Sequence, residues 1–435
     1  MNSIEKLKRL TGENIKISIE PPEKNEKLSD LRRRIDDIMS RPHKYNQDAA
    51  DRRMNAAAVK LKELVSGEEI ENDYGKFFLI SDFVRGSCRH GHRNISEAYD
   101  FDMTAAAMLA NNPGISGFSC SDGLFLDTET TGLAGGTGTM AFLIGLGWFE
   151  GCHFHVRQIL ARDFGEEKAA LAHLADIAGQ KKFLVTFNGK AFDINLLVTR
   201  FILNRLEGGL ASLPHLDLLH PARRILGHRL ANSRLVTLEA EILGVMREGD
   251  VPGWEIPQRY FDWLKRRDPR LLTGIFKHNR LDVISMATLT AHLTEIVTAR
   301  TLIKDTHIDD FLAAAHLLLN RRDLQGTGKI LSMFNEQSCT AFPPPSKKKL
   351  ASLYKRTGRL TEAVHLWQEM VACKPPDFYA VSELAKWLEH RVSDCRQAKI
   401  LVETALQQDN VFSAEEKESL RHRLKRLQGK TGDGG

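Results

Sequence analysis

The sequence predicts an α/β domain with a mixed sheet flanked by helices, followed by an α-helical repeat domain. Residues 123–160 contain three consecutive strand signals, and signals for a helix, a strand and a helix follow them. This order is typical of a mixed sheet that is covered by helices. Beyond about residue 305 the strand signals end, and only helical patterns continue.

The length of the chain allows more than one domain. It has 435 residues, and a single hydrophobic core stops growing at about 250–300 residues. We expect a charged N-terminal lead-in, mostly helical or irregular, over residues 1–118 and the α/β domain over residues 119–300. The helical repeat region then covers residues 301–428, and residues 429–435 form a disordered tail.

The lead-in contains few regular elements and no constellation of catalytic residues. Apolar residues at helical spacing predict helices over residues 27–39 and 49–64, after a break at Pro21-Pro22. Residues 77–80 predict a short strand, and the turn residues at 111–114 predict a loop.

The α/β domain is predicted from apolar runs that are separated by turn residues. The strands are expected at residues 123–127, 140–149, 152–160 and 183–187, and the helices at 166–177, 192–206 and 235–243. Glu150-Gly151 is expected to form the hairpin between the second and third strands.

The C-terminal region contains two related helix pairs, over residues 350–371 and 379–405. The segment Ala351–Pro375 has small residues where two helices approach each other, Gly358 in the turn, and Pro after the second helix. It resembles a tetratricopeptide repeat, whose period is about 34 residues. The alternative is a helical hairpin without repeat ancestry.

The composition is that of an ordinary globular protein. The formal net charge of +5 is compatible with a polyanionic partner but does not identify one. The six cysteines are scattered, without the spacing of a disulfide framework or a zinc site. The first residues lack the apolar core of a signal peptide, and the most apolar stretch, 140–149, is far shorter than a membrane span of about 20 residues. We therefore expect a cytoplasmic protein with no membrane segment.

Asp127 and Glu129 stand at the end of an apolar strand, in Leu-Phe-Leu-Asp-Thr-Glu-Thr-Thr-Gly (124–132). Because side chains alternate along a strand, the two carboxylates point to the same face. They repel each other unless cations lie between them, and hard oxygen ligands suit Mg²⁺ or Mn²⁺. A solvated pair on a surface strand is the alternative, but three apolar residues come directly before Asp127.

Asp193 lies in Phe-Asn-Gly-Lys-Ala-Phe-Asp-Ile-Asn-Leu-Leu (187–197), in the first turn of the helix that follows a buried-type strand. A carboxylate at this position can simply stabilise the helix N-terminus. It also lies at the carboxyl end of a strand, where open α/β sheets bind ligands, and this favours a functional role.

His278 and Asp282 are four residues apart and share one face of a predicted helix over Phe276–Met286. An imidazole of near-neutral pKa beside a metal-binding carboxylate can take a proton from an attacking water. Taken alone, the pair favours the alternative of a capping His and an exposed Asp.

In this order, the three elements resemble the DEDD superfamily of 3′–5′ exonucleases, whose fold is ribonuclease H-like. Segments 127–132, 187–197, 250–257 and 278–286 are similar to its YprB-type branch, and the resemblance covers roughly residues 120–295. The repeats of that family also match the helical C-terminus.

The position of His278 departs from the family pattern. In the His-bearing subclass the His stands five residues before the last Asp, and in the Tyr-bearing subclass a Tyr stands four residues before it. His278 has the Tyr spacing, which rotates the imidazole by about 100° on the helix relative to the usual His.

The resemblance implies hydrolysis of terminal phosphodiester bonds of DNA or RNA with Mg²⁺ or Mn²⁺, two ions per site. The implied metal ligands are Asp127, Glu129, Asp193 and Asp282, with Asp127 bridging, and His278 is the implied base. The implied partners are a single-stranded or 3′-ended nucleic acid and a protein that binds the repeats.

The resemblance also implies contacts with the terminal nucleotide, from Thr130, Thr131 and Leu133, while Lys190, with Arg200 and Arg280, is a candidate phosphate neighbour. The glycine-rich stretch 132–139 lacks the Gly-Lys-Ser/Thr ending of a phosphate loop and precedes a strand, so we expect a hairpin turn there.

Two alternatives remain open. The first is a ribonuclease H-like domain that has lost activity and serves as a nucleic-acid-binding or scaffold protein through its repeats. The four carboxylates argue against it, because an inactive domain gains nothing from acids that repel each other. The second is a metal-dependent phosphatase or transferase with a small-molecule substrate, which would require a closed pocket.

Overall fold

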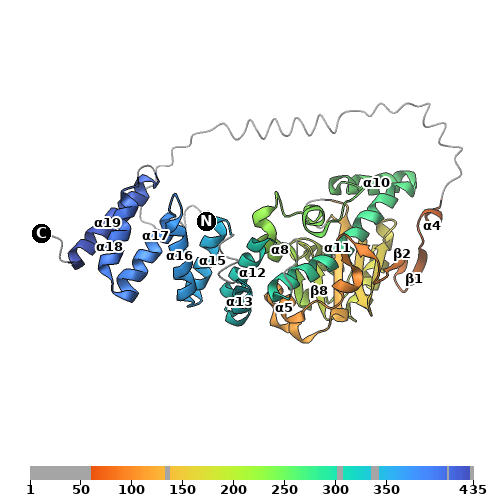
Figure 1. Ribbon diagram of the computed structural model, residues 1–435. Coiled ribbons are helices and arrows are strands. Elements are labelled where there is room, and N and C mark those ends of the chain that lie inside the picture. The colour runs from red at the N-terminus through yellow and green to blue at the C-terminus, as the bar shows by residue number, and fades with distance from the viewer. Residues whose placement is uncertain (1–59, 133–137, 301–306, 335–341, 409–410, 432–435) are drawn as a thin grey trace, which may run out of the picture. The chain divides into compact units, whose positions relative to one another are not determined.

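The computed structural model describes residues 60–132, 138–300, 307–334, 342–408 and 411–431, and Figure 1 shows its elements. Their order confirms the predicted fold class, a mixed sheet with flanking helices followed by an all-helical region. The helix expected at 27–39 and most of the one at 49–64 lie outside the described residues, and the short helix α4 (Leu61–Leu64) is the part that is seen.

The sheet has seven strands in the order β1-β2-β7-β6-β5-β8-β9. Neighbouring strands in the part β1-β2-β7-β6-β5 are antiparallel, whereas β5 pairs with β8, and β8 with β9, in parallel. The strands are β1 (Glu68–Asn72), β2 (Gly75–Val84), β5 (Gly123–Thr130), β6 (Ala141–Glu150), β7 (His153–Leu160), β8 (Phe183–Thr186) and β9 (His215–Asp217).

The N-terminal part of the sheet differs from the expected lead-in. Residues before 119 were expected to be mostly helical or irregular, yet β1 and β2 belong to the same sheet as β5. The strand expected at 77–80 is confirmed and is longer, because β2 pairs along β7 from Phe78 to Val84. The edge strand β1 has the sequence Glu-Glu-Ile-Glu-Asn, and its charged, exposed side chains hide the strand pattern.

Helices cover both faces of the sheet (Figure 1). One face packs against α5 (Met103–Ala110), α8 (Leu219–Leu226) and most of α11 (Arg270–Thr298). The other face packs against α6 (Glu167–Ala178), α7 (Asp193–Leu203) and α10 (Ile256–Arg266). The sheet therefore lies between two helical layers.

Two predicted elements have different details in the structure. The helix expected at 235–243 consists of a short helix, α9 (Leu235–Leu238), and a π-helical turn that ends at Gly244, whose φ is 69°. Of the glycine-rich stretch, residues 133–137 lie outside the described part, but its flanks pair as a hairpin because Thr131 N–H donates to the Met140 carbonyl at 2.9 Å. The expected hairpin therefore joins antiparallel strands β5 and β6.

The C-terminal region is built from helices that pack in consecutive pairs: α12 (Ile308–Asn320) with α13 (Leu324–Leu331), α15 (Pro344–Arg356) with α16 (Leu360–Ala372), and α17 (Phe378–Trp387) with α18 (Cys395–Leu406). The first helices of the second and third pairs begin 34 residues apart, at Pro344 and Phe378. This spacing is consistent with the tetratricopeptide repeat that the sequence predicts.

The helical region and the α/β region share a buried core. One cluster of buried side chains runs from Phe125 of β5 through α11 to Leu353 and Trp367 of α15 and α16. The division of the chain at residue 300 therefore does not separate two independent cores.

The last helix is α19 (Ala414–Thr431), which packs against α18. Its basic side chains, Arg423, Arg426 and Lys430, form ion pairs at 2.6–2.9 Å with the buried carboxylate of Glu389. The tail expected to be disordered from residue 429 is helical as far as Thr431, and residues 432–435 lie outside the described part.

The remaining expectations concern thiols and membranes. Each cysteine in the described part of the chain is a free thiol. None of the described helices is long and apolar enough to cross a membrane.

Candidate active site

Asp127 and Glu129 lie near the carboxyl end of the central strand β5. Phe125, two residues before Asp127, packs into the cluster that contains α11, whereas Leu124 and Leu126 pack into the cluster on the opposite face. Because side chains alternate along the strand, Asp127 and Glu129 share the face on which α11 lies. The strand that the sequence predicts to carry the pair is therefore present.

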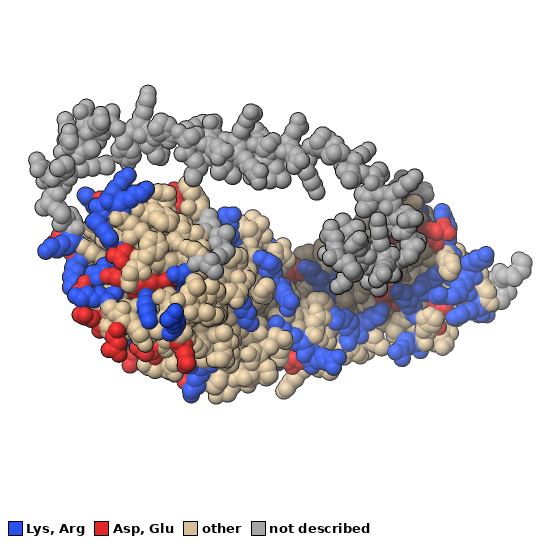
Figure 2. All heavy atoms as spheres, turned by 180° about the vertical axis from the view of Figure 1, so that it is seen from behind, with Lys and Arg blue, Asp and Glu red and all other residues tan. Residues whose placement is uncertain are grey.

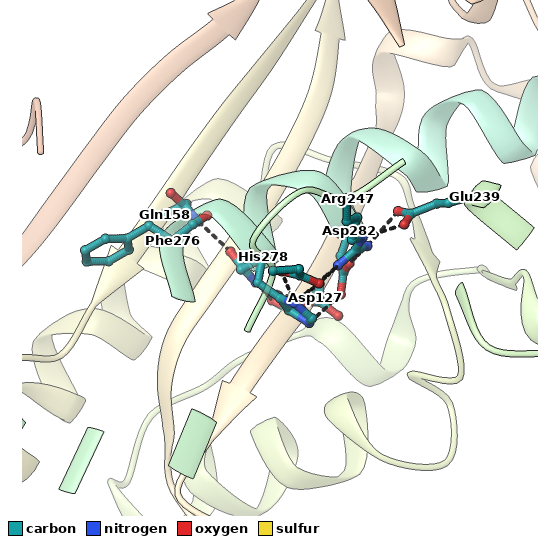
Figure 3. Close-up of polar contacts among 9 residues, drawn as sticks. Asp127, Gln158, Glu239, Arg247, Phe276, His278 and Asp282 are labelled. Carbon is teal, nitrogen blue, oxygen red and sulfur yellow. Dashed lines mark hydrogen bonds and ion pairs between the residues drawn. The ribbon is translucent and has the colours of Figure 1, made fainter. Parts of the chain in front are cut away.

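A buried asparagine of α11 holds the Asp127 side chain. Asn279, which is fully buried, donates from Nδ2 to Oδ2 of Asp127 at 2.8 Å. The Asn279 Oδ1 in turn accepts a hydrogen bond from Gln158 Nε2 at 2.8 Å, and the same Gln158 nitrogen donates to the Phe276 carbonyl (Figure 3). The chain of amides thus fixes both the position and the orientation of the Asp127 carboxylate.

Gly145 makes room for this asparagine. In the sheet, Gly145 of β6 stands opposite Asp127 of β5. A Cβ atom at this position would lie 2.2 Å from Oδ1 of Asn279, so any larger residue would push α11 away from the strand. Glycine is therefore required here for the close approach of helix and sheet, not for an unusual backbone angle.

Asp193 is the first residue of α7, on the other side of β5. Thr128, whose side chain points away from the face of Asp127, donates its hydroxyl to Oδ1 of Asp193 at 2.5 Å. The loop before α7 is held by Asp217 of β9, whose carboxylate accepts the backbone N–H groups of Asn188 and Lys190 at 2.8 and 3.0 Å. Asp193 is thus anchored to the strand that carries Asp127 and Glu129.

His278 and Asp282 lie on α11 and face each other at 3.6 Å, between Nε2 and Oδ2. The other ring nitrogen, Nδ1, lies 2.9 Å from both carboxylate oxygens of Asp250. A carboxylate can only accept a hydrogen bond, so Nδ1 carries a proton in this contact. Asp250 therefore orients His278 so that Nε2 is directed toward Asp282.

Arg247 is a buried cation beside Asp250 and Asp282. Its side chain is only 3% exposed and forms ion pairs with Glu239, Asp250 and Asp282. Figure 3 shows the guanidinium between Asp282 and Glu239. Two of its nitrogens bind the fully buried Glu239 at 2.5 and 2.6 Å, so the arginine is anchored from behind while it contacts Asp282.

The pKa values of the acidic residues show how crowded the site is with negative charge. Burial is the largest cause that raises the pKa of Asp127, Glu129 and Asp193. The charges of Asp282 and Asp193 raise the pKa of Asp127 further, and the charge of Asp127 raises that of Glu129. The carboxylates lie near enough to oppose one another's ionisation, which is the electrostatic condition that a bound cation relieves.

Burial would also raise the pKa of Asp250, but the hydrogen bond and charge of His278, followed by those of Arg247, hold that pKa below its usual value. Asp250 is therefore the ionised partner of His278 at neutral pH.

The fit of these residues to a divalent cation rests on their chemistry. Asp127, Glu129, Asp193 and Asp282 offer only hard oxygen donors, which suit Mg²⁺ and Mn²⁺. In the described ranges, however, no three His, Cys, Asp or Glu side chains are arranged closely enough to hold a metal ion. Asp282 is held instead in an ion pair with Arg247.

The residues expected to bind substrate are only partly available. Thr130 Oγ1 donates to the Gly132 carbonyl at 2.7 Å, and Thr131 Oγ1 accepts from the Met140 N–H at 2.9 Å, so both hydroxyls also serve the turn after β5. Leu133 lies outside the described residues. Lys190 is exposed on the loop before Asp193.

Two further cations that were candidate phosphate neighbours are engaged elsewhere. Arg200 forms an ion pair with Glu167 at 2.5 Å, and Arg280 forms one with Asp82 at 2.8 Å.

Sequence reasoning missed Asn279, Arg247, Glu239 and the positioning roles of Asp217 and Asp250. Asn279 directly follows His278, and an amide on the buried side of a helix is a signal that could have been used, because a buried amide needs partners. Arg247 and Glu239 gave no such signal, because charged residues eight positions apart are usually solvated.

Comparison with known proteins agrees with the fold. Residues 124–294 match the model of a family described as the RNase_H superfamily. The chain is 34% identical over 358 residues to "Uncharacterized protein YprB" of Bacillus subtilis (strain 168), an alignment that covers 79% of this chain and 84% of that protein. The chain therefore belongs to the YprB family, with an RNase H superfamily domain at its centre.

Proposed function

We propose that this protein is a metal-dependent 3′–5′ exonuclease that hydrolyses terminal phosphodiester bonds of DNA or RNA. The observation that carries the proposal is the convergence of Asp127, Glu129, Asp193 and Asp282 from β5, α7 and α11, where the charges of Asp282 and Asp193 raise the pKa values of Asp127 and Glu129. Membership of the RNase H superfamily supports a nuclease, and the order of the acidic residues along the chain supports the exonuclease type.

These four carboxylates would hold Mg²⁺ or Mn²⁺, two ions per site. When bound, the cations would offset the carboxylate charges and stabilise the negative charge that develops on the phosphate. Asn279 would keep the Asp127 carboxylate in one orientation, and Thr128 would do the same for Asp193.

His278 would accept the proton of the attacking water at Nε2, while its Nδ1–H remains hydrogen-bonded to the Asp250 carboxylate. The negative charge of Asp250 would then stabilise the imidazolium after the transfer. Because the Asp250 contact sets which nitrogen is free, the four-residue spacing between His278 and Asp282 still leaves a proton acceptor facing the carboxylates.

The test measures the release of mononucleotides from oligonucleotides labelled at the 3′ or the 5′ end, with Mg²⁺ or Mn²⁺. We expect release from the 3′ end by the wild type and none above background by Asp127→Asn or Asp282→Asn. Asp176→Asn, an exposed acid on α6, is the matched control and should retain full activity. Equal release by the wild type and the two site variants would refute the proposal.

His278→Ala should reduce the rate by about 10²–10⁴-fold if the imidazole is the base. Calorimetric titration of Mn²⁺ gives a readout that does not depend on turnover: wild type and His278→Ala should bind the ion, and Asp127→Asn should bind it more weakly.

One observation favours the alternative of an inactive scaffold. The ion pair of Arg247 with Asp282 supplies a positive charge from the protein itself, where an active site would use a metal. Failure of Mn²⁺ to bind the wild type, together with no release from any DNA or RNA substrate, would favour that alternative.

A further inference from the structure

A large cavity lies where the α/β region meets the helical region. Its volume is about 1240 Å³, and its walls come from the end of α5, the loop before α7, and helices α8, α12, α15 and α17. This volume exceeds the range of about 300–1,000 Å³ that is usual for small-molecule sites. The space therefore suits an extended ligand better than a compact one.

The walls of this cavity are basic. Five Lys or Arg residues line it, against two carboxylates: Lys190, Arg224, Arg321, Lys348 and Lys349, against Asp217 and Asp309. Both carboxylates already accept hydrogen bonds, Asp217 from backbone N–H groups and Asp309 from Ser346 and Lys349. Figure 2 shows that Lys and Arg side chains are also numerous over the helical half, on the right of that view.

Four of these cations have no carboxylate partner within the described part of the chain: Lys190, Arg224, Arg321 and Lys348. Exposed cations such as Lys190 and Arg224 are often only solvated, so their presence alone would not indicate a ligand. The side chain of Arg321 is different, because part of it is buried.

Arg321 has an unsatisfied guanidinium nitrogen. Its Nη1 is buried and lacks a hydrogen-bond partner within the described residues, and its Nη2 makes one long contact of 3.4 Å with the Leu109 carbonyl. Burial lowers the pKa of Arg321, and the charge of Arg224 lowers it further. A buried donor without an acceptor is unfavourable, and a phosphate oxygen is an acceptor that a guanidinium binds strongly.

The cavity also begins beside the proposed active site. Lys190, on its wall, is three residues before Asp193, in the loop that Asp217 holds. At the far end, Tyr379 of α17 lies under Lys348, whose Nζ is 5.3 Å from the ring centroid. Cations together with apolar and aromatic side chains are the combination that binds single strands, since phosphates meet the charges and bases stack on the rings.

We propose that this cavity binds the backbone of a single-stranded nucleic acid, upstream of the 3′ end that is hydrolysed. The inference rests on the proposed function for the polarity of the strand. The phosphates contact Arg321, Arg224 and Lys348, and the strand passes Lys190 before its end reaches the carboxylates. The helical repeats thereby form one wall of the substrate path.

The test compares wild type with the triple variant Arg224→Gln/Arg321→Gln/Lys348→Gln. Binding of a fluorescent 20-nucleotide single strand is measured by anisotropy in EDTA at several salt concentrations. Each phosphate contact contributes about 0.7 to the slope of log affinity against log salt for single strands. We expect the triple variant to lose about 2 from this slope and at least about tenfold in affinity at low salt.

The matched control is Lys265→Gln/Arg391→Gln/Arg396→Gln, which removes the same number of cations, all of them exposed, away from the cavity. It should bind like the wild type. If the triple cavity variant does not fold, Lys348→Gln alone should still lower the slope by about 0.7. A slope equal to that of the control would overturn the inference.

Hydrolysis of a dinucleotide, which is too short to reach Arg321, separates this inference from the proposed function. We expect the triple variant to cleave it at the wild-type rate. Normal dinucleotide cleavage with an unchanged slope would overturn the cavity assignment and leave the exonuclease standing. A reduced slope with no cleavage by the wild type would support the cavity and overturn the exonuclease. Binding of an acidic peptide but no oligonucleotide would also overturn the inference.

Discussion

Gly145→Ala should destabilise the protein through one specific contact. The new methyl group would meet three side-chain atoms of Asn279, with Oδ1 at 2.2 Å and Cγ and Nδ2 at 2.7 Å. Overpacking of this kind costs about 1–3 kcal/mol, and displacing the amide leaves a buried donor or acceptor unsatisfied for about another 1–3 kcal/mol. The free energy of unfolding should therefore fall by about 2–6 kcal/mol.

Thermal unfolding monitored by circular dichroism measures the effect. At about 2–4 °C per kcal/mol for a domain of this size, the midpoint should fall by at least about 4 °C. Gly117→Ala is the matched control, because a Cβ there has no neighbour within 4 Å and its backbone is not in the left-handed region. A Gly145→Ala midpoint equal to that of the control would refute the reasoning.

A double-mutant cycle tests whether Asn279 is the cause. Asn279→Ala removes all three atoms that the new methyl group would meet. Gly145→Ala should therefore destabilise the Asn279→Ala protein by at least about 1 kcal/mol less than it destabilises the wild type. Equal effects in both backgrounds would show that the helix is displaced by some other contact.

Three further perturbations follow from the ion pairs and the loop anchor. Arg247→Ala leaves the fully buried Glu239 unpaired and should lower the free energy of unfolding by about 3–5 kcal/mol in urea, with Glu239→Gln partly restoring it; no loss would refute the pairing. Burial opposes ionisation of Glu389, but hydrogen bonds from α19 lower its pKa from 4.5 to about 2. The ionised carboxylate therefore contributes about 3 kcal/mol to the free energy of unfolding above pH 4.5, and this contribution is lost as the pH falls toward 2. In an acid titration followed by far-ultraviolet circular dichroism, Glu389→Gln should show a smaller unfolding transition than the wild type. An identical transition in both proteins would contradict the assignment. Asp217→Asn should increase amide hydrogen exchange at residues 188–190, because an amide cannot accept all the N–H bonds of the carboxylate; unchanged protection would argue against the anchor.

Local patterns sufficed for the elements that carry the acidic residues. Asp127 and Glu129 follow an apolar strand, and a period of two alone places both side chains on one face. The helical position of His278 and Asp282 follows from their spacing in the same way. These features depend on neighbours within a few residues, which is the range over which periodicity is informative.

The first part of the sheet could not be read in this way. β1 is an edge strand with three Glu residues, a composition that does not predict a strand. Its pairing with β2 holds it in the strand conformation. The helix expected at 235–243 is confirmed in its bounds, but local patterns did not predict that its second half is a π-helical turn, which ends at Gly244 beside His92.

The sequence by itself determined the fold class and the order in which the four carboxylates and His278 occur along the chain. Only the tertiary structure decided which residues hold them. Asn279 donates a hydrogen bond to Asp127 in the space that Gly145 leaves open. Asp250 contacts Nδ1 of His278, and Arg247 forms an ion pair with Asp282. The physical reason is distance along the chain. These partners lie up to 152 residues apart, and their contact depends on strand register and helix docking, which no local pattern encodes.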